Sequence, residues 1–368
     1  MANITYIFTK NRKSNYLNNT IQAKEFYYGL PFINSQSNNI EIIEFNEEVT
    51  FFTKFINIFD EILRRFISLP FYTSKLISKK NIEIIKNTDH LIIIPESSGL
   101  SILIILILFK RKYQINSSIF VMGLYSKKIR YQIFKKIHFI VIKLLIMNID
   151  NVFFLGKGEY EKACNVHNQF SNKFHYFPFC IDTDFWKSKN FNIDNNKDII
   201  FVGNDGNRDF ELLVKIAERL VDFNFIFISK NQNLKSLNLE NVHVVSGEWG
   251  SEDVSDLHLK NYYERAKLCI LPLRQTSQPS GQSVALQSMA LGIPVLISKT
   301  EGFWDKDNFI DNQNIIFCDN SLDSWERKIK DVYKESELLN KISMNARSTV
   351  RNNFNLNIFN EKLDSFLS

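Results

Sequence analysis

The sequence CILPLRQTSQPSGQSVALQSMALGIPVLISKTEGFWD, residues 269–305, contains a strand, a loop, a helix and a second strand in that order. Residues 269–273 form a short apolar run, which predicts a buried parallel strand. Residues 275–282 are polar and include proline and glycine, so they predict a loop. Residues 283–291 have the apolar spacing of a helix, and residues 295–298 predict another buried strand.

The junction between this loop and the helix is a candidate phosphate site. A helix that begins directly after a polar, glycine-containing loop presents free backbone N–H groups and the positive end of its dipole. The residues at that point are Ser280, Gly281, Gln282 and Ser283. Such a junction suits a phosphate or pyrophosphate, but an ordinary strand–helix–strand crossover without a ligand explains the same spacing.

The stretch resembles the donor-binding segment of group 1 (family 4-like) glycosyltransferases of the GT-B fold, which reads E-G-F-G-x-x-x-x-E-A-M-A-x-G-x-P-V. Residues 287–295 (QSMALGIPV) match its second half. Where the family has two glutamates, this chain has Pro279 and Gln287. In the family the second glutamate binds the ribose hydroxyls of the sugar nucleotide, and the amide of Gln287 could still form hydrogen bonds to them.

The order of elements agrees with this resemblance. Strand-like runs at residues 4–8, 40–45, 90–95, 118–122 and 151–155 alternate with helical segments, for which we expect ranges that include 18–28, 51–67, 100–109 and 131–147. The predicted class is α/β, with GT-B architecture: two doubly wound Rossmann-like domains facing a cleft. We expect an acceptor-binding domain at 1–185, a nucleotide-sugar-binding domain at 186–345, and a C-terminal helix at 346–368 that crosses back to the first domain.

The resemblance implies further donor-binding residues in the second half. A buried strand at 198–203 is followed by a turn in which the family places a basic residue against the donor pyrophosphate, and Arg208 is the candidate. A surface arginine in a loop is the alternative. Trp249 either stacks on the nucleobase or packs on a neighbour. The expected donor contacts outside the 280–283 junction are Gly203, Asn204, Arg208, Lys230, Trp249 and Gln287.

The first half offers one titratable candidate for catalysis. Glu96 directly follows the strand-like run HLIIIP and could orient or deprotonate an acceptor hydroxyl. As an acid near a helix N-terminus it could equally serve only to stabilise that helix. Many retaining family members carry a histidine after the strand that here ends at residues 120–125, and this chain has none there. The expected acceptor contacts are Lys10, Arg12, Ser97, Ser98, Gly123 and Tyr125.

Composition limits the partners. The chain has 368 residues and a net charge of +5, with Lys and Arg in excess over the first half and Asp and Glu in excess over the second. A basic first half favours an anionic partner, such as a membrane surface, a phosphorylated lipid carrier or an acidic glycan. Nucleic acid is not expected, because no nucleic-acid-binding module is recognisable. The segment 131–147 is either a basic helix lying on a membrane or, as the more favoured interpretation, a core helix with one solvated stripe.

The resemblance implies a retaining, hexosyltransferase-like enzyme that uses a UDP- or GDP-linked sugar and no essential metal. Four widely spaced cysteines indicate reduced thiols and no zinc site. We expect a cytoplasmic protein, with peripheral contact at the inner face of the plasma membrane, that modifies a glycan or lipid-linked acceptor during surface polysaccharide or glycolipid synthesis. Two alternatives stay open: a catalytically silent nucleotide-sugar-binding partner of another transferase, and a GT-B sugar-nucleotide epimerase.

Overall fold

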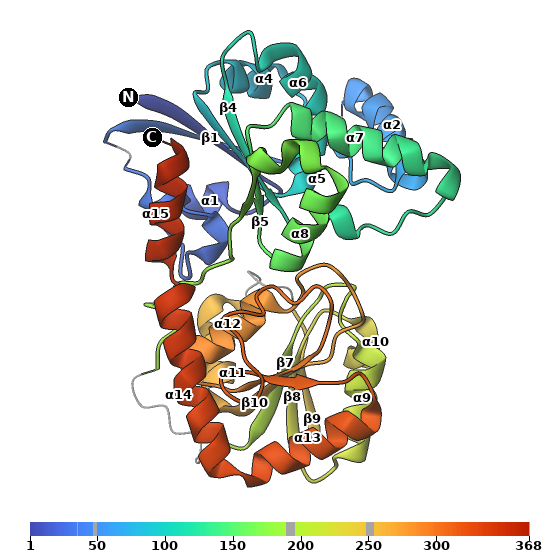
Figure 1. Cartoon of the computed structure of the whole chain (residues 1–368), viewed down its shortest axis with the longest axis vertical. Coiled ribbons are helices and arrows are strands. Elements are labelled where there is room, and N and C mark those ends of the chain that lie inside the picture. The colour runs from blue at the N-terminus through green and yellow to red at the C-terminus, as the bar shows by residue number, and fades with distance from the viewer. Residues whose placement is uncertain (35, 47–49, 189–195, 248–253, 368) are drawn as a thin grey trace. The chain divides into compact units, whose positions relative to one another are not determined.

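The chain divides into two compact units, each built on its own parallel sheet (Figure 1). The computed structural model describes all residues except 35, 47–49, 189–195, 248–253 and 368. Unit 1 comprises residues 1–21, 27–178 and 364–368, and unit 2 comprises residues 22–26 and 179–363. Two Rossmann-like units of this kind are the predicted α/β class.

Unit 1 contains a six-stranded parallel sheet in the order β2-β1-β3-β4-β5-β6. Its strands are β1 (Ala2–Phe8), β2 (Asn38–Glu44), β3 (His90–Ile93), β4 (Asn116–Val121), β5 (Asn151–Phe154) and β6 (Phe174–Tyr176). Its helices are α1 (Lys13–Leu17), η2 (Leu30–Phe32), α2 (Phe51–Ile67), α3 (Thr73–Leu76), α4 (Lys79–Lys86), α5 (Glu96–Ser101), α6 (Leu103–Phe109), η3 (Leu124–Ser126), η4 (Gln132–Phe134), α7 (Lys135–Met147), α8 (Lys157–Val166) and η5 (Asn168–Lys173).

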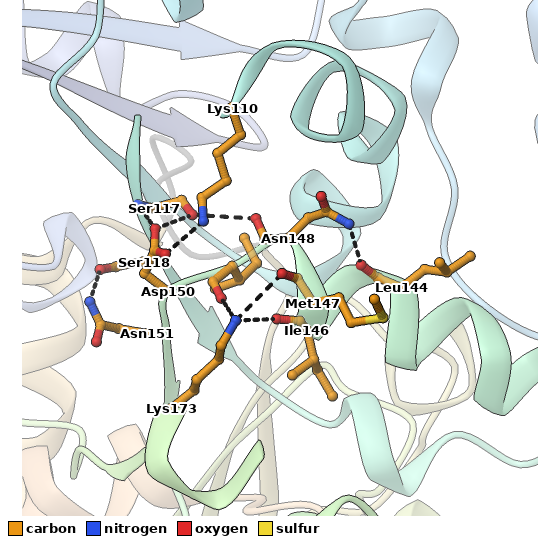
Figure 2. Close-up of polar contacts among 11 residues, drawn as sticks. Lys110, Ser117, Ser118, Leu144, Ile146, Met147, Asn148, Asp150, Asn151 and Lys173 are labelled. Carbon is orange, nitrogen blue, oxygen red and sulfur yellow. Dashed lines mark hydrogen bonds and ion pairs between the residues drawn. The ribbon is translucent and has the colours of Figure 1, made fainter. Parts of the chain in front are cut away.

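A polar network ties together the amino ends of β4 and β5 (Figure 2). The Asp150 carboxylate binds Lys110 Nζ at 2.6 Å through Oδ1 and the Ser117 backbone N–H at 2.8 Å through Oδ2. Beside it, Lys173 Nζ donates to the carbonyl oxygens of Ile146 at 3.1 Å and Ile149 at 2.6 Å, at and just beyond the end of α7. A cation there complements the negative end of the helix dipole. These charges stabilise the amino edge of the sheet, the edge opposite to the loops that carry the site residues.

Unit 2 contains a second six-stranded parallel sheet, in the order β12-β11-β10-β7-β8-β9. Its strands are β7 (Asp198–Val202), β8 (Asn224–Ile228), β9 (Val242–Val245), β10 (Ala266–Leu271), β11 (Val295–Ser298) and β12 (Ile316–Cys318). Its helices are α9 (Phe210–Arg219), α10 (Gln232–Lys235), α11 (Asp256–Arg265), α12 (Gln282–Leu291), α13 (Leu322–Lys334), α14 (Ser336–Asn353) and α15 (Leu356–Leu367), whose last residues belong to unit 1.

Both sheets are covered on their two faces, which explains the continuous apolar runs in the sequence. All six residues of β10 and all four of β11 are buried. A parallel sheet with helices on both faces selects such runs rather than alternating ones. The strand, loop, helix and strand predicted for residues 269–305 are therefore confirmed as β10, a loop, α12 and β11.

The helix predicted at residues 18–28 is wrong. That segment contains the 3-10 turn η1 (Glu25–Tyr27), and its residues 22–26 pack into unit 2. There the Ala23 N–H donates to Asp256 Oδ2 at 3.1 Å, and the Leu257 N–H donates to Gln22 Oε1 at 3.1 Å. These hydrogen bonds to distant residues outweigh local helix propensity. The helix predicted at 100–109 is also divided, into α5 and α6, with Ile102 between them.

Candidate functional site

The candidate site in unit 2 lies at the reversal point of its sheet. From β7 the chain adds β8 and β9 on one side, then returns to add β10, β11 and β12 on the other. In open parallel sheets, ligands bind at the carboxyl ends of the strands where the order reverses. The loops after β7 and β10 therefore come together at that place. They carry most of the predicted donor contacts.

The loop after β7 is held by Asn204. Its Oδ1 accepts hydrogen bonds from the Lys230 backbone N–H at 2.6 Å and from Ser229 Oγ at 3.0 Å. Asn204 is itself exposed, and so is Lys230. Asn204 thus fixes the carboxyl ends of β7 and β8 to one another, and the backbone at Gly203 runs directly beside the buried side chain of Arg208.

The Arg208 side chain is buried, with 4% of its surface exposed. Among the described residues, Nε and Nη1 have no hydrogen-bond partner, while Nη2 lies 3.5 Å from Asp205 Oδ2. A Cβ on Gly203 would approach Nε to 2.1 Å, and a Cβ on Gly281 would approach Nη1 to 3.0 Å. A buried cation with unsatisfied N–H groups is costly, so a bound anion would compensate for it. The alternative of a surface arginine is wrong.

The loop before α12 contacts the loop that carries Arg208. Asn207 Nδ2 donates to Ser280 Oγ at 2.8 Å, which joins the two loops. Gly281 has φ 79° and begins α12 without a side-chain cap. Ser280 and Gln282 are buried, and Ser283 is half-buried. An uncapped helix N-terminus next to a guanidinium is the combination that holds a phosphate group.

Glu25 is a further site residue that sequence reasoning missed. Its carboxylate is buried, and Oε1 accepts hydrogen bonds from Trp186 Nε1 at 2.7 Å and Gln287 Nε2 at 2.9 Å. Burial raises the pKa of Glu25 to about 7. The hydrogen bond from Gln287 is the second-largest effect and acts in the opposite direction. The family's second glutamate is therefore replaced by an amide that contacts another carboxylate.

No local signal in the sequence points to Glu25. It lies 262 residues before Gln287 and comes from a segment that we predicted as part of a helix. Only the long-range packing of residues 22–26 into unit 2 brings the two side chains together. The predicted contact Trp249 lies outside the described residues.

The predicted catalytic residue Glu96 lies at the equivalent reversal point of unit 1, where β1 and β3 are neighbours. It is buried, its Oε2 accepts the Met122 N–H at 3.0 Å, and Oε1 lies 3.3 Å from Lys127 Nζ. Glu96 is thus fixed in orientation at the carboxyl edge of the sheet.

A second buried carboxylate, Glu159, accompanies Glu96. Its Oε1 accepts the Tyr125 N–H at 2.9 Å, while Oε2 has no partner among the described residues. Burial first, and the charge of Glu96 second, raise the pKa of Glu159 to about 8. Its place at the start of the helix after β5 is a sequence signal that could have identified it.

The predicted acceptor contacts differ in accessibility. Tyr125 is buried and its hydroxyl lies 2.8 Å from His167 Nδ1, while Ser98 Oγ donates to the Ile94 carbonyl at 3.0 Å. The exposed Arg12 Nη1 donates to the Lys10 carbonyl at 2.7 Å. Ser97 is buried in α5, and Gly123 adopts φ 121°. The acceptor role of all six residues stays a prediction.

The described residues contain no group of three or more His, Cys, Asp or Glu side chains that could hold a metal ion. None of the helices resolved in the described part of the chain is long and apolar enough to cross a membrane.

The chain is similar to known proteins in sequence over part of its length and in fold over all of it. Residues 196–335 match the family model described as glycosyl transferases group 1. Among solved structures, sucrose-phosphate synthase from Thermosynechococcus elongatus is similar with a TM-score of 0.69 and 12% identity, covering 100% of this chain and 98% of that one. HepE from Anabaena, in complex with UDP and glucose, has a TM-score of 0.66 and 10% identity, covering 100% and 99%.

A glycosyltransferase from Rickettsia africae ESF-5 is also similar, with a TM-score of 0.64 and 13% identity over 99% of this chain and 97% of that one. At these identities the likeness shows the fold, which is GT-B. A comparison with curated protein sequences gives no match.

Proposed function

We propose that this chain transfers a sugar from a nucleotide-sugar donor to a glycan or lipid-linked acceptor, because residues 196–335 match the family model described as glycosyl transferases group 1. The observation that carries the proposal is the Arg208 guanidinium, buried beside the uncapped start of α12 with Nε and Nη1 unpartnered. A diphosphate supplies the oxygens that those N–H groups lack.

In the proposed reaction the bond between the anomeric carbon and the donor diphosphate breaks, and a bond from that carbon to an acceptor hydroxyl oxygen forms. Arg208 and the N–H groups of α12 stabilise the negative charge on the departing nucleoside diphosphate. Glu96 accepts the proton of the acceptor hydroxyl. By the family resemblance we propose retention of the anomeric configuration and transfer of a hexosyl group.

The donor is proposed to be UDP- or GDP-linked. The Anabaena HepE structure that shares this fold holds UDP and glucose, which supports uridine over guanosine. The proposed setting is the cytoplasm, in surface polysaccharide or glycolipid synthesis, with peripheral contact to an anionic membrane. The basic excess of the first half of the chain supports that contact.

The first test is nucleotide binding, measured by thermal shift and calorimetry with UDP, GDP, CDP and their sugar conjugates. We expect one nucleoside diphosphate to raise the melting temperature. Arg208→Ala should weaken its binding by at least about tenfold, since charge-assisted hydrogen bonds to phosphate contribute about 1.5–3 kcal/mol each.

The matched control is Arg265→Ala, which removes an exposed arginine at the end of α11, just before the amino end of β10. It should leave binding unchanged. If no nucleotide binds the wild-type chain, the proposed function is wrong.

A catalytically silent nucleotide-sugar-binding partner is the second candidate. It is favoured by Pro279 and Gln287, which stand where the family has its two glutamates. Both candidates bind the nucleotide, so the discriminating measurement is turnover: release of nucleoside diphosphate from the sugar nucleotide, with and without acceptor glycans or lipids. Binding without any release would support the silent partner.

A further inference from the structure

The helix α2 is oriented with its apolar face outward. Its large exposed side chains are Phe51, Phe52, Phe55, Ile58, Phe59 and Ile62. The exposed fractions are 85% for Phe51, 61% for Phe55 and 61% for Phe59. An amphipathic helix of a globular protein normally turns this face to the core, so these side chains need another explanation.

The inward face of α2 shows that the orientation is built into the fold. The buried residues of the helix are Asp60 and Ile67. Asp60 Oδ2 accepts the Ser74 N–H at 2.9 Å, and the Ile67 carbonyl lies 2.6 Å from Nδ1 of the buried His138. If the helix were rotated to bury its phenylalanines, the buried hydrogen bond between the Ser74 N–H and Asp60 would be lost.

A second apolar stripe adjoins this face. Residues Ile133, Ile137, Ile140, Leu144 and Met147 of η4 and α7 are exposed at helical spacing. Phe66 of α2 joins the two helices, because its ring lies 5.4 Å from the ring of Phe134. Figure 1 shows α2 beside α7 in unit 1. We call the exposed side chains of α2, η4 and α7 the apolar face.

The charges beside the apolar face have one dominant sign. Exposed basic residues are Lys54 and Arg65 on α2 and Lys135, Lys136 and Lys143 on α7. α7 contains no acidic residue, and the exposed acid of α2, Glu61, lies 4.0 Å from Arg64. Aromatic and aliphatic side chains flanked by lysine and arginine suit the interface of an anionic bilayer, where the rings enter the acyl boundary and the cations remain at the headgroups.

We propose that the apolar face of α2, η4 and α7 docks unit 1 onto an anionic phospholipid bilayer. This surface deepens the proposed function by favouring the lipid-linked class of acceptor over a free glycan. It rests on that function only in this respect, since the docking itself requires no catalytic step. A protein partner or a second copy of this chain would cover the same side chains, and the test below separates these occupants.

The test is flotation of the full-length chain with vesicles of phosphatidylcholine alone or with about one third phosphatidylglycerol. We expect binding to the anionic vesicles that is at least about tenfold weaker without phosphatidylglycerol. Phe55→Ser/Phe59→Ser should reduce it at least about tenfold, and Lys135→Gln/Lys136→Gln/Lys143→Gln by a similar factor.

The matched control is Val221→Ser/Met344→Ser, which removes two similarly exposed apolar side chains from unit 2 and should leave flotation unchanged. Circular dichroism and nucleoside diphosphate binding in all variants report folding and the donor site separately from docking. If the wild-type chain floats but binds no nucleoside diphosphate, the proposed function is overturned and the docking surface stands.

Three results would overturn the docking proposal. The wild-type chain does not float with anionic vesicles, or the phenylalanine variant floats as well as the wild type. In the third, the wild-type chain is a dimer by light scattering and the same variant is a monomer, which would show that a second copy covers the apolar face.

Discussion

In the candidate site, Glu25 places a carboxyl group beside Gln287, which stands where the family has a glutamate. The amide of Gln287 contacts the carboxylate of Glu25 at 2.9 Å. A carboxyl group from a distant segment therefore lies in this part of unit 2, although the local sequence lacks the family's glutamate. Its ionisation is coupled to folding, because burial raises the pKa of Glu25 to about 7.

The raised pKa of Glu25 makes the stability of the fold depend on pH in a definite direction. Between the ordinary carboxyl pKa of 4.5 and the raised value of about 7, the folded state holds a proton on Glu25 that the unfolded state has lost. Glu25 therefore stabilises the fold less as pH rises through that window, by about 3 kcal/mol in total. Glu25→Gln should remove this contribution, so the variant gains stability relative to the wild type as pH rises.

The measurement is the free energy of unfolding by urea for both proteins at a series of pH values. Glu159, whose pKa is also raised, has the same sign, but it is present in both proteins and cancels from their difference. Parallel stability curves for wild type and variant across the window would show that Glu25 is not the titrating group.

At the scale of elements, the loop that enters α12 depends on Gly281. Its φ of 79° lies in the left-handed region, and a Cβ there would reach Arg208 Nη1 at 3.0 Å. Gly281→Ala should lower the free energy of unfolding by about 1–2 kcal/mol because of the backbone conformation, and should weaken nucleoside diphosphate binding because it displaces the guanidinium.

The matched control is Gly206→Ala in the loop after β7, where an added Cβ meets nothing within 4 Å. Denaturant unfolding and calorimetry with the nucleoside diphosphate that binds the wild-type chain would measure both effects. Equal binding by Gly281→Ala and Gly206→Ala would contradict the proposed phosphate site at the start of α12.

The helix α2 shows the limit of periodicity as evidence. Its bounds, Phe51–Ile67, agree with the predicted range. Periodicity identifies an apolar face but does not say whether that face contacts the core or another apolar phase. The burial of Asp60 decides the orientation, and that depends on the backbone of Ser74 in the next helix.

At the scale of the whole molecule, the chain order and the structural units do not coincide. Residues 22–26 belong to unit 2, and residues 364–368, at the end of α15, belong to unit 1. In unit 1 the Phe366 ring lies 4.8 Å from the rings of Phe153 and His175. Part of the stability of unit 1 therefore comes from the C-terminus of the chain.

Phe366→Ala should destabilise unit 1 by about 1–2 kcal/mol, from lost aromatic contacts and apolar burial. Hydrogen exchange followed by mass spectrometry would localise the effect, with faster exchange expected in β5 and β6 and no change in β7 or β10. Met344→Ala, at an exposed position of α14, is the control. Uniformly faster exchange in both units would contradict the assignment.

The sequence by itself determined the α/β class, the strands β1–β5, β7, β10 and β11, and the junction before α12. These depend on apolar runs, a glycine and a proline, which act on the backbone within a few residues. It also indicated Glu96 as a candidate, because an acidic residue just after a parallel strand lies at the carboxyl edge. Arg208 was a candidate through the family resemblance.

Only the tertiary structure decided what those residues contact. The burial of Arg208 between Gly203 and Gly281, the pairing of Glu25 with Gln287, and the outward face of α2 all join segments that are distant in sequence. Such contacts depend on the relative placement of several elements, which the periodicity of one element does not encode. Hydrogen bonding and burial of distant groups, rather than local propensity, therefore determine the chemistry of the site.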